Sequence, residues 1–94
     1  MKEISRISTD NGSIYIKRLC KHFSHKVPAS FSENEGNVEF PYGDCIMTSD
    51  DNQLTFVITA DSEENLSNVK SVLISHLEKF SRDEELTVEW HKQD

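Results

Sequence analysis

Cysteine and histidine side chains, which could bind a metal ion, gather in one short stretch of the chain. Cys20, His22 and His25 read as a string of metal-ligand types. If the stretch is helical, residues two apart leave the helix about 200° apart, so Cys20 and His22 point to opposite sides. His22 and His25 share a face but stand beside lysines, whose charge repels a divalent cation. The spacing therefore disfavours a metal site made from this string alone.

The exposed side of the same stretch is better suited to an anion. Its cationic side chains are Arg18, Lys21, His22, His25 and Lys26. Together they could hold a phosphate, a carboxylate or an acidic partner through charge-assisted hydrogen bonds. A simpler interpretation is also available, because the helix dipole favours cations near a C-terminus without any ligand.

Two further residues extend the list of candidates. Cys45 follows Gly43 near the start of an expected strand and could approach Cys20 across a helix–sheet layer. His76 lies at the margin of an apolar helix stripe, where a histidine with an ordinary pKa near 6.5 is easily recruited. Cys20, Cys45 and His76 are thus the candidates for a metal or redox site. The competing interpretation of Cys20 is a small core residue, because it shares a face with apolar neighbours.

Other catalytic patterns are missing from the sequence. The glycines at positions 12, 36 and 43 are scattered turn residues and form no phosphate-binding loop. No local signature combines a nucleophile, a base and an orienting group. We therefore expect no catalytic residues and no bound cofactor, and we favour a binding role over an enzymatic one.

Charge is unevenly distributed along the chain. The net charge is −7, but residues 1–26 carry +4 and residues 27–94 carry −11. The acidic majority argues against a nucleic-acid partner, which requires a basic footprint. The basic segment predicts a local anion site or pairing with an acidic surface. Because the two segments could complement each other across a two-fold axis, a homodimer is among the expected assemblies.

Length and hydropathy limit the class of protein. The 94 residues fit a single domain over 1–94. No apolar run approaches the about 20 residues of a membrane span, and Met1–Arg6 lacks the apolar stretch of a signal peptide. We expect a cytoplasmic protein without a membrane partner, in which both cysteines are reduced thiols.

The hydrophobic pattern predicts the elements that position these residues. Strands are expected at Glu3–Thr9, Ala29–Ser32, Asn37–Phe40, Asp44–Ser49, Gln53–Ala60 and 86–90, with a loop at Glu33–Gly36. Helices are expected over 13–26, ending before Pro28, and from Asp61 to near 81–82. Asp61 and Glu64 have the spacing of a capping box, so Asp61 is expected to cap the second helix.

The order β-α-β-β-β-β-α-β predicts an α+β fold. Each expected helix has one apolar stripe, so the fold should be a two-layer sandwich of a mainly antiparallel sheet with two helices on one face. A ferredoxin-like plait with an added hairpin and a curved sheet like that of the TATA-binding protein both fit this order.

Four strings of residues resemble a known family. They are Leu19–Pro28, Phe40–Cys45, His76–Phe80 and Leu86–Trp90. They resemble the small bacterial family called domain of unknown function 2218, for which no activity is established, and the resemblance covers nearly the whole chain. It implies recurrent polar positions at Cys20, Lys21, His22, His25, Lys26, Cys45 and His76. Arg82 stands where the family usually has an aromatic residue.

The resemblance also implies a biological setting. Family members look like stand-alone proteins of about this length, or like extra domains on siderophore-interacting flavin reductases, which release iron from siderophores. The expected function is a binding or accessory domain in siderophore-iron use, whose basic helix meets an anionic small ligand or a reductase-type protein. The alternative is a Cys/His metal-binding or redox protein that uses Cys20, Cys45 and His76.

Overall fold

A six-stranded sheet and two helices make up the computed structural model, which describes residues 1–93. The strands are β1 (Lys2–Ser8), β2 (Ala29–Phe31), β3 (Glu35–Phe40), β4 (Gly43–Ser49), β5 (Gln53–Thr59) and β6 (His91–Lys92). The helices are α1 (Gly12–Phe23) and α2 (Glu63–Phe80). The α+β class and the order of elements are as predicted, and every neighbouring pair of strands is antiparallel.

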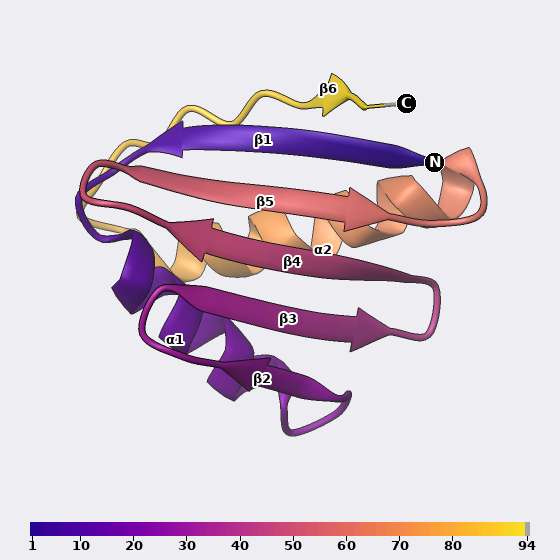
Figure 1. The fold of residues 1–94 in the computed structure, drawn as a ribbon, viewed down its shortest axis with the longest axis horizontal. Helices are drawn as coiled ribbons and strands as arrows, with labels where there is room; N and C mark the ends of the chain where they lie inside the picture. Colours follow the sequence, from indigo (N-terminus) through magenta and orange to yellow (C-terminus); the bar gives the residue numbers. More distant parts are fainter. Residues whose placement is uncertain (94) are drawn as a thin grey trace.

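The first strand joins the sheet beside the last strand of the meander. The strand order is β2-β3-β4-β5-β1-β6, and β1 pairs with β5 from Lys2 opposite Thr59 to Ser8 opposite Gln53 (Figure 1). The strands that α1 connects, β1 and β2, are therefore separated by three others. A ferredoxin-like plait places a single strand between the two strands joined by its first helix. Of the two predicted arrangements, only the curved sheet with two helices fits this order.

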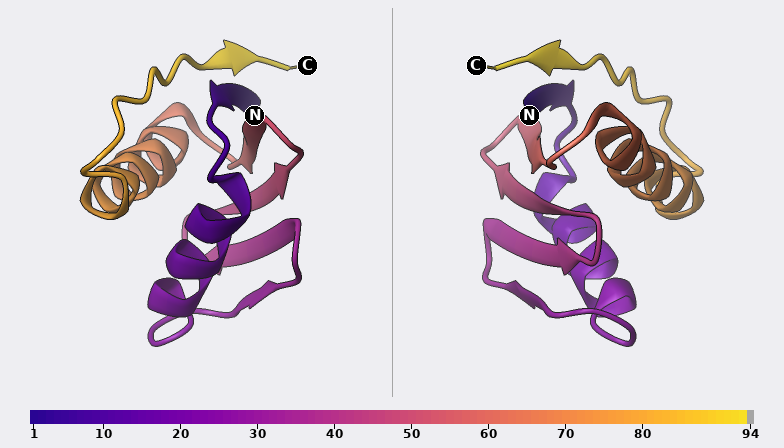
Figure 2. Two further views of the ribbon diagram at one scale, coloured as in Figure 1. Left: turned by 90° about the vertical axis from the view of Figure 1, so that its left-hand side faces the viewer. Right: turned by 90° about the vertical axis from the view of Figure 1, so that its right-hand side faces the viewer.

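Both helices cover the same face of the sheet and leave the opposite face open (Figures 1 and 2). The core between the two layers is formed by alternate strand residues and by one stripe of each helix. Its largest fully buried side chains include Phe56, Ile7, Ile16, Leu19, Met47, Leu54, Ile58, Leu73 and Leu77. Burial of each such side chain contributes about 1.5–3 kcal/mol, so the amphipathic stripes fix which side of each helix remains exposed.

Helix α1 ends three residues earlier than predicted. The backbone N–H groups of Lys26 and Val27 both donate to the carbonyl of Phe23, which closes a turn over residues 24–27. His25 and Lys26 therefore lie on this turn and not on the helix. The turn brings the chain to Pro28, which disfavours helical geometry in the residue before it.

The start of α2 also differs in its cap. Ser62, not Asp61, is the N-cap, and its hydroxyl accepts a hydrogen bond of 3.1 Å from the backbone N–H of Asn65. Asp61 instead accepts from the Asn65 side-chain amide at 2.9 Å. Asp61 thus supports the helix start from the residue before the cap.

The strand predicted for residues 86–90 is wrong, because strand pairing begins only at His91. Leu86, Val88 and Trp90 are nevertheless half-buried and pack against the core, and the residues between them are exposed. Trp90 stacks on Phe56 at a centroid distance of 6.4 Å. The alternation in the sequence therefore predicts correctly which of these side chains are partly buried. It does not predict hydrogen bonds to a neighbouring strand, because this segment makes none of the strand's pairing.

The side chain of Glu84, near the start of this C-terminal segment, binds residues at the start of α1. One carboxylate oxygen accepts hydrogen bonds from Thr9, Asn11 and the hydroxyl of Tyr15. These hydrogen bonds, that from Tyr15 foremost, hold the pKa of Glu84 below its usual value despite some burial. The segment after α2 is therefore tied to the start of α1.

Gly36 lies inside β3 and not in the loop predicted for Glu33–Gly36. It faces α1, and a Cβ atom at this position would lie 2.7 Å from the Sγ of Cys20 and 2.8 Å from a methyl carbon of Ile16. Helix α1 therefore rests directly on the backbone of β3, an approach that only a residue without a side chain allows.

Substitution of Gly36 by Ala is expected to destabilise the protein by about 1–3 kcal/mol, because the added methyl group overpacks the helix–sheet contact. Urea unfolding of the two proteins measures the difference. In a Cys20→Ala background one of the two close contacts is absent, so the same substitution should cost less. An equal cost in both backgrounds would contradict the close approach of α1 to β3.

Candidate functional site

His22, one residue before the end of α1, lies against His76 of α2. Their ring centroids are 4.5 Å apart, with the ring planes inclined at 43°. The ring of Phe23 is 5.0 Å from that of His76, and the ring of Phe80 is 6.1 Å from that of His22. The two histidines thus meet on an aromatic surface where the helices come together.

A backbone hydrogen bond sets the tautomer of His76. Its Nδ1 is 2.7 Å from the carbonyl oxygen of Val72, one turn earlier in α2. Because a carbonyl only accepts, Nδ1 carries the hydrogen and the Nε2 of the neutral ring is left unprotonated.

A hollow of about 260 Å³ opens beside the two histidines. Its lining residues are His22, Phe23, Lys26, Val27, Phe40, Pro41, Tyr42, Val72 and His76. Phe23 meets Phe40 edge to face at 5.0 Å, and Phe40 stacks on Tyr42 at 5.5 Å. A wall of aromatic rings with cationic groups along one side suits a flat apolar group that carries a negative charge.

All the side-chain charges that shift the pKa of His22 are positive. Partial burial lowers this pKa most, and further lowering comes from His76, Lys79, His25 and Lys26. The ion pairs within residues 1–93 join Lys70 to Glu3 and Lys92 to Glu63, so neither involves this group. Like charges gathered without a counter-ion raise the energy of the empty site, and a bound anion would lower it.

The residues predicted for an anion site are only partly brought together. His25 and Lys26 act on His22 from the turn that follows α1. Arg18 is directed elsewhere, since its guanidinium donates to the carbonyl of Phe80 at 3.2 Å near the C-terminal end of α2. Lys21 is exposed on α1. His76, predicted as a metal candidate, lies against His22 and lines the same hollow as Lys26.

The two thiols lie in the core. Cys20 and Cys45 are both free and buried, as predicted for Cys20 from its helix face. Burial raises the pKa of both, and the nearby Cys20 raises that of Cys45 further, so both are protonated at neutral pH. Within residues 1–93, no group of three or more His, Cys, Asp or Glu side chains is placed to hold a metal ion. The metal or redox use of Cys20, Cys45 and His76 stays a prediction.

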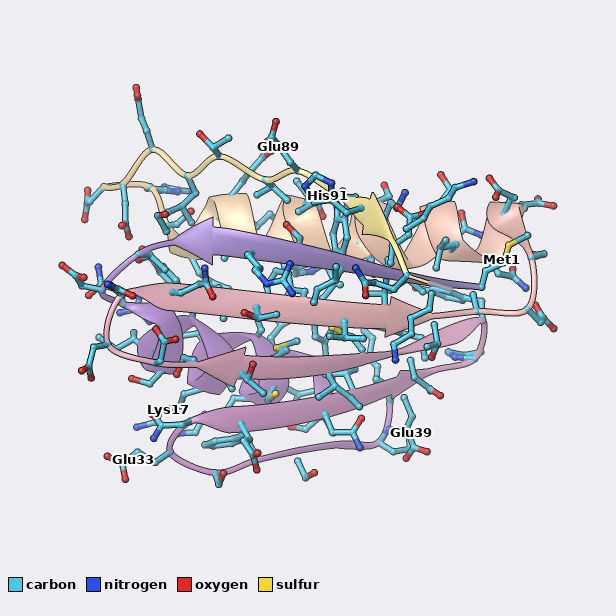
Figure 3. All side chains as sticks on the ribbon, turned by 45° about the horizontal axis from the view of Figure 1, so that its top comes forward. Met1, Lys17, Glu33, Glu39, Glu89 and His91 are labelled. Atoms are coloured by element: carbon cyan, nitrogen blue, oxygen red, sulfur yellow. The ribbon has the colours of Figure 1, made fainter. Side chains whose placement is uncertain are left out.

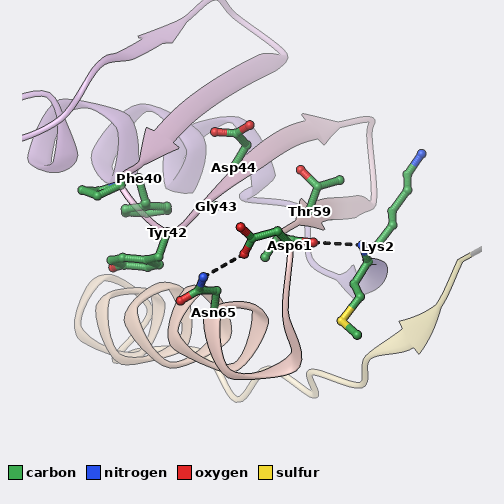
Figure 4. A pocket seen from close by; sticks show the side chains of 11 residues that line it. Lys2, Phe40, Tyr42, Gly43, Asp44, Thr59, Asp61 and Asn65 are labelled. Atoms are coloured by element: carbon green, nitrogen blue, oxygen red, sulfur yellow. Dashed lines mark hydrogen bonds between the residues drawn. The ribbon is translucent and has the colours of Figure 1, made fainter.

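A larger hollow of about 530 Å³ shares the turn between β3 and β4 but has a different character (Figure 4). The carboxylates of Asp44 and Asp61 line it, together with the Lys2 side chain. Its polar groups are already partly engaged, because Asp61 accepts from Asn65 at 2.9 Å and the amino group of Met1 donates to the carbonyl of Ala60 at 2.9 Å. We therefore place the candidate anion site in the smaller hollow.

Sequence reasoning missed Lys79 and the aromatic wall. Lys79 lies three residues after His76 in α2, a spacing that puts both on one side of a helix, so this pair could have been found. Phe23 and Phe40 fall within a predicted helix and a predicted strand, and Tyr42 lies between two predicted strands. Nothing in the sequence indicates that α1 and α2 meet at His22, because that contact depends on how both helices sit on the sheet.

Comparison with known proteins agrees with this fold. A family model described as "Uncharacterized protein conserved in bacteria (DUF2218)" matches residues 4–91. No curated protein matches the chain. The NMR structure of PA4090 from Pseudomonas aeruginosa is similar, with 23% sequence identity and a TM-score of 0.81 over 96% of this chain and 94% of that one. At this identity the likeness shows the fold alone. Within residues 1–93, no helix is long and apolar enough to cross a membrane.

The pKa of His22 should lie below its ordinary value of about 6.5. A ring-proton NMR titration measures it, and Lys79→Ala should raise it by removing a positive neighbour, whereas Lys17→Ala on the exposed side of α1 should not. Since protonation of His22 favours the unfolded chain, the free energy of unfolding should fall as the pH drops from about 7 to 5, and less so in His22→Gln. A pKa of His22 at or above 6.5 would contradict a cationic surrounding.

Proposed function

The chain belongs to the DUF2218 family of uncharacterised bacterial proteins, and within it we propose a small binding domain that holds an anionic ligand between α1 and α2. One observation carries the proposal. The rings of His22 and His76 lie 4.5 Å apart beside a hollow that Lys26 also lines, and no carboxylate is among the groups that lower the pKa of His22. An anion bound between these side chains would supply the negative charge that the site lacks.

The chemistry of the ligand follows from the hollow beside this group. The carboxylate, phosphate or phenolate of a ligand would lie between His22, His76 and Lys26, which can donate charge-assisted hydrogen bonds. Its apolar part would lie on the rings of Phe40 and Tyr42, which border the same hollow. The proposed ligand is therefore an anion carried on a flat or aromatic group.

Binding should take up protons. Because the pKa of His22 is lowered in the free protein, an anion that stabilises the imidazolium form raises that pKa on binding. The complex is consequently tighter below neutral pH than above it. This linkage separates a site built around histidines from general attraction to lysines, which stay charged across that range.

The setting that we propose is siderophore-iron use in the cytoplasm. Its support is the resemblance to domains found alone or beside siderophore-interacting flavin reductases. The ligand chemistry agrees with it, since a catechol-bearing acid combines an aromatic ring with negative charge. In this setting the domain would present a small anionic ligand, or dock through the same cationic surface on a reductase-type protein.

Titration with 2,3-dihydroxybenzoate and, separately, with inorganic phosphate tests the site in ¹⁵N-labelled protein. We expect both to shift the signals of His22, His76 and Lys26, and only the aromatic acid to shift those of Tyr42 and Phe40. Lys26→Glu should weaken binding of the aromatic acid at least about tenfold, since loss of a charged hydrogen bond costs about 1.5–3 kcal/mol.

Lys17→Glu is the matched control, because it makes the same charge change on the exposed side of α1. It should alter the affinity less than about twofold. Binding of the wild type should tighten from pH 8 to pH 6, and His22→Gln should reduce that pH dependence. Equal losses in the two Lys→Glu variants, or signals that do not respond to either anion, would overturn the proposal.

A further inference from the structure

The face of the sheet turned away from the helices is open across its width (Figure 1). Strand registers arrange the outward side chains of β3, β4, β5 and β1 in three rows that cross the strands. Figure 3 draws the side chains on the sheet, and its labels place Glu39 and Met1 at the same end. What the three rows contain decides what the face can bind.

The middle row is mostly apolar. It runs from Asn37 through Ile46 and Val57 to Ile4, each opposite the next in the register. Ile46 is 52% exposed and is one of the few large apolar side chains left open to water. Polar residues flank this row within β4 and β5, namely Asp44, Thr48, Thr55 and Thr59. An exposed apolar strip with a polar border is the pattern of an interaction surface.

The two flanking rows carry opposite charges at opposite ends. One row contains Glu39, Asp44, Thr59 and Lys2, and the other contains Glu35, Thr48, Thr55 and Arg6. In each row the acidic end lies on β3 and the basic end on β1. The face is thus negative along one side, apolar in the middle and positive along the other side.

We propose that this face binds the same face of a second copy of the chain. A two-fold axis between β4 and β5, lying in the face and close to the strand direction, reverses each row onto itself. Ile46 then meets the partner's Val57, and Glu35 meets the partner's Arg6. Glu39 likewise meets the partner's Lys2. The contact is isologous, and the charges on β3 and β1 meet the opposite sign, whereas Asp44 meets a threonine.

The geometry of packed sheets accommodates this pairing. Two sheets stacked face to face cross at about 30°, which an axis inclined by about 15° to the strands produces. The two longer dimensions of the molecule, 32 and 28 Å, bound a face of about 900 Å², and a stable interface needs about 800 Å² from each partner. The contact uses nearly the whole face, so we expect a reversible, concentration-dependent dimer.

Sedimentation equilibrium of the full chain tests the apolar strip. Ile46→Asp should raise the dimer dissociation constant at least tenfold while circular dichroism stays unchanged. Ile14→Asp is the matched control, because Ile14 is similarly exposed at 46% but lies on α1. It should leave the dissociation constant within twofold. A wild type that stays monomeric up to about 1 mM, or equal effects of both variants, would overturn the proposal.

A charge exchange tests the two-fold arrangement independently of core packing. Arg6→Glu should weaken the dimer, and adding Glu35→Arg should restore it, because each new charge then meets the opposite sign on the partner. Within one molecule Arg6 and Glu35 are three strand spacings apart, about 14 Å, so rescue cannot arise inside the monomer. A double variant no tighter than Arg6→Glu alone would overturn this arrangement.

Discussion

The contact on which the rest of the structure depends is the approach of α1 to the backbone of β3 at Gly36. Cys20 and Ile16 occupy the space that a side chain at this position would fill. Because both belong to the buried stripe of α1, the contact fixes the rotation of the helix as well as its distance from the sheet. His22, two residues after Cys20, is thereby turned away from the sheet and toward α2.

This placement of α1 explains why imidazole and ammonium side chains gather at the margin of the core between the helices and the sheet. The buried stripes of α1 and α2 must both face the sheet, so the helices converge with His22 and His76 at their margin. The aromatic rings of Phe23, Phe40 and Tyr42 continue the core outward to the same point. The site thus gathers imidazole and ammonium groups beside an aromatic hollow, and the proposed anion would lie among them.

Much of the fold could be predicted from local pattern, because alternation in β5 and the apolar stripes of the helices mark what must be buried. The missed features depend on tertiary structure. In the sequence Gly36 resembles a loop glycine, and its close contact with α1 is visible only in the folded structure. The alternation of Leu86, Val88 and Trp90 indicates burial, but it cannot show whether a neighbouring strand pairs with them. For the site, residue types identified His22, Lys26 and His76 separately. Their meeting, and the diversion of Arg18 to the end of α2, follow from helix packing.

The proposed ligand site on the helix side of the sheet requires α1 to be seated as described, whereas the proposed contact with a second copy uses the open side. Nuclear Overhauser contacts in the wild-type protein measure that seating most directly. We expect cross-peaks between the ring protons of His22 and His76, together with cross-peaks from the Gly36 α-protons to the Cys20 β-protons. His22 ring protons without any contact to α2, or Gly36 without contact to Cys20, would contradict the account.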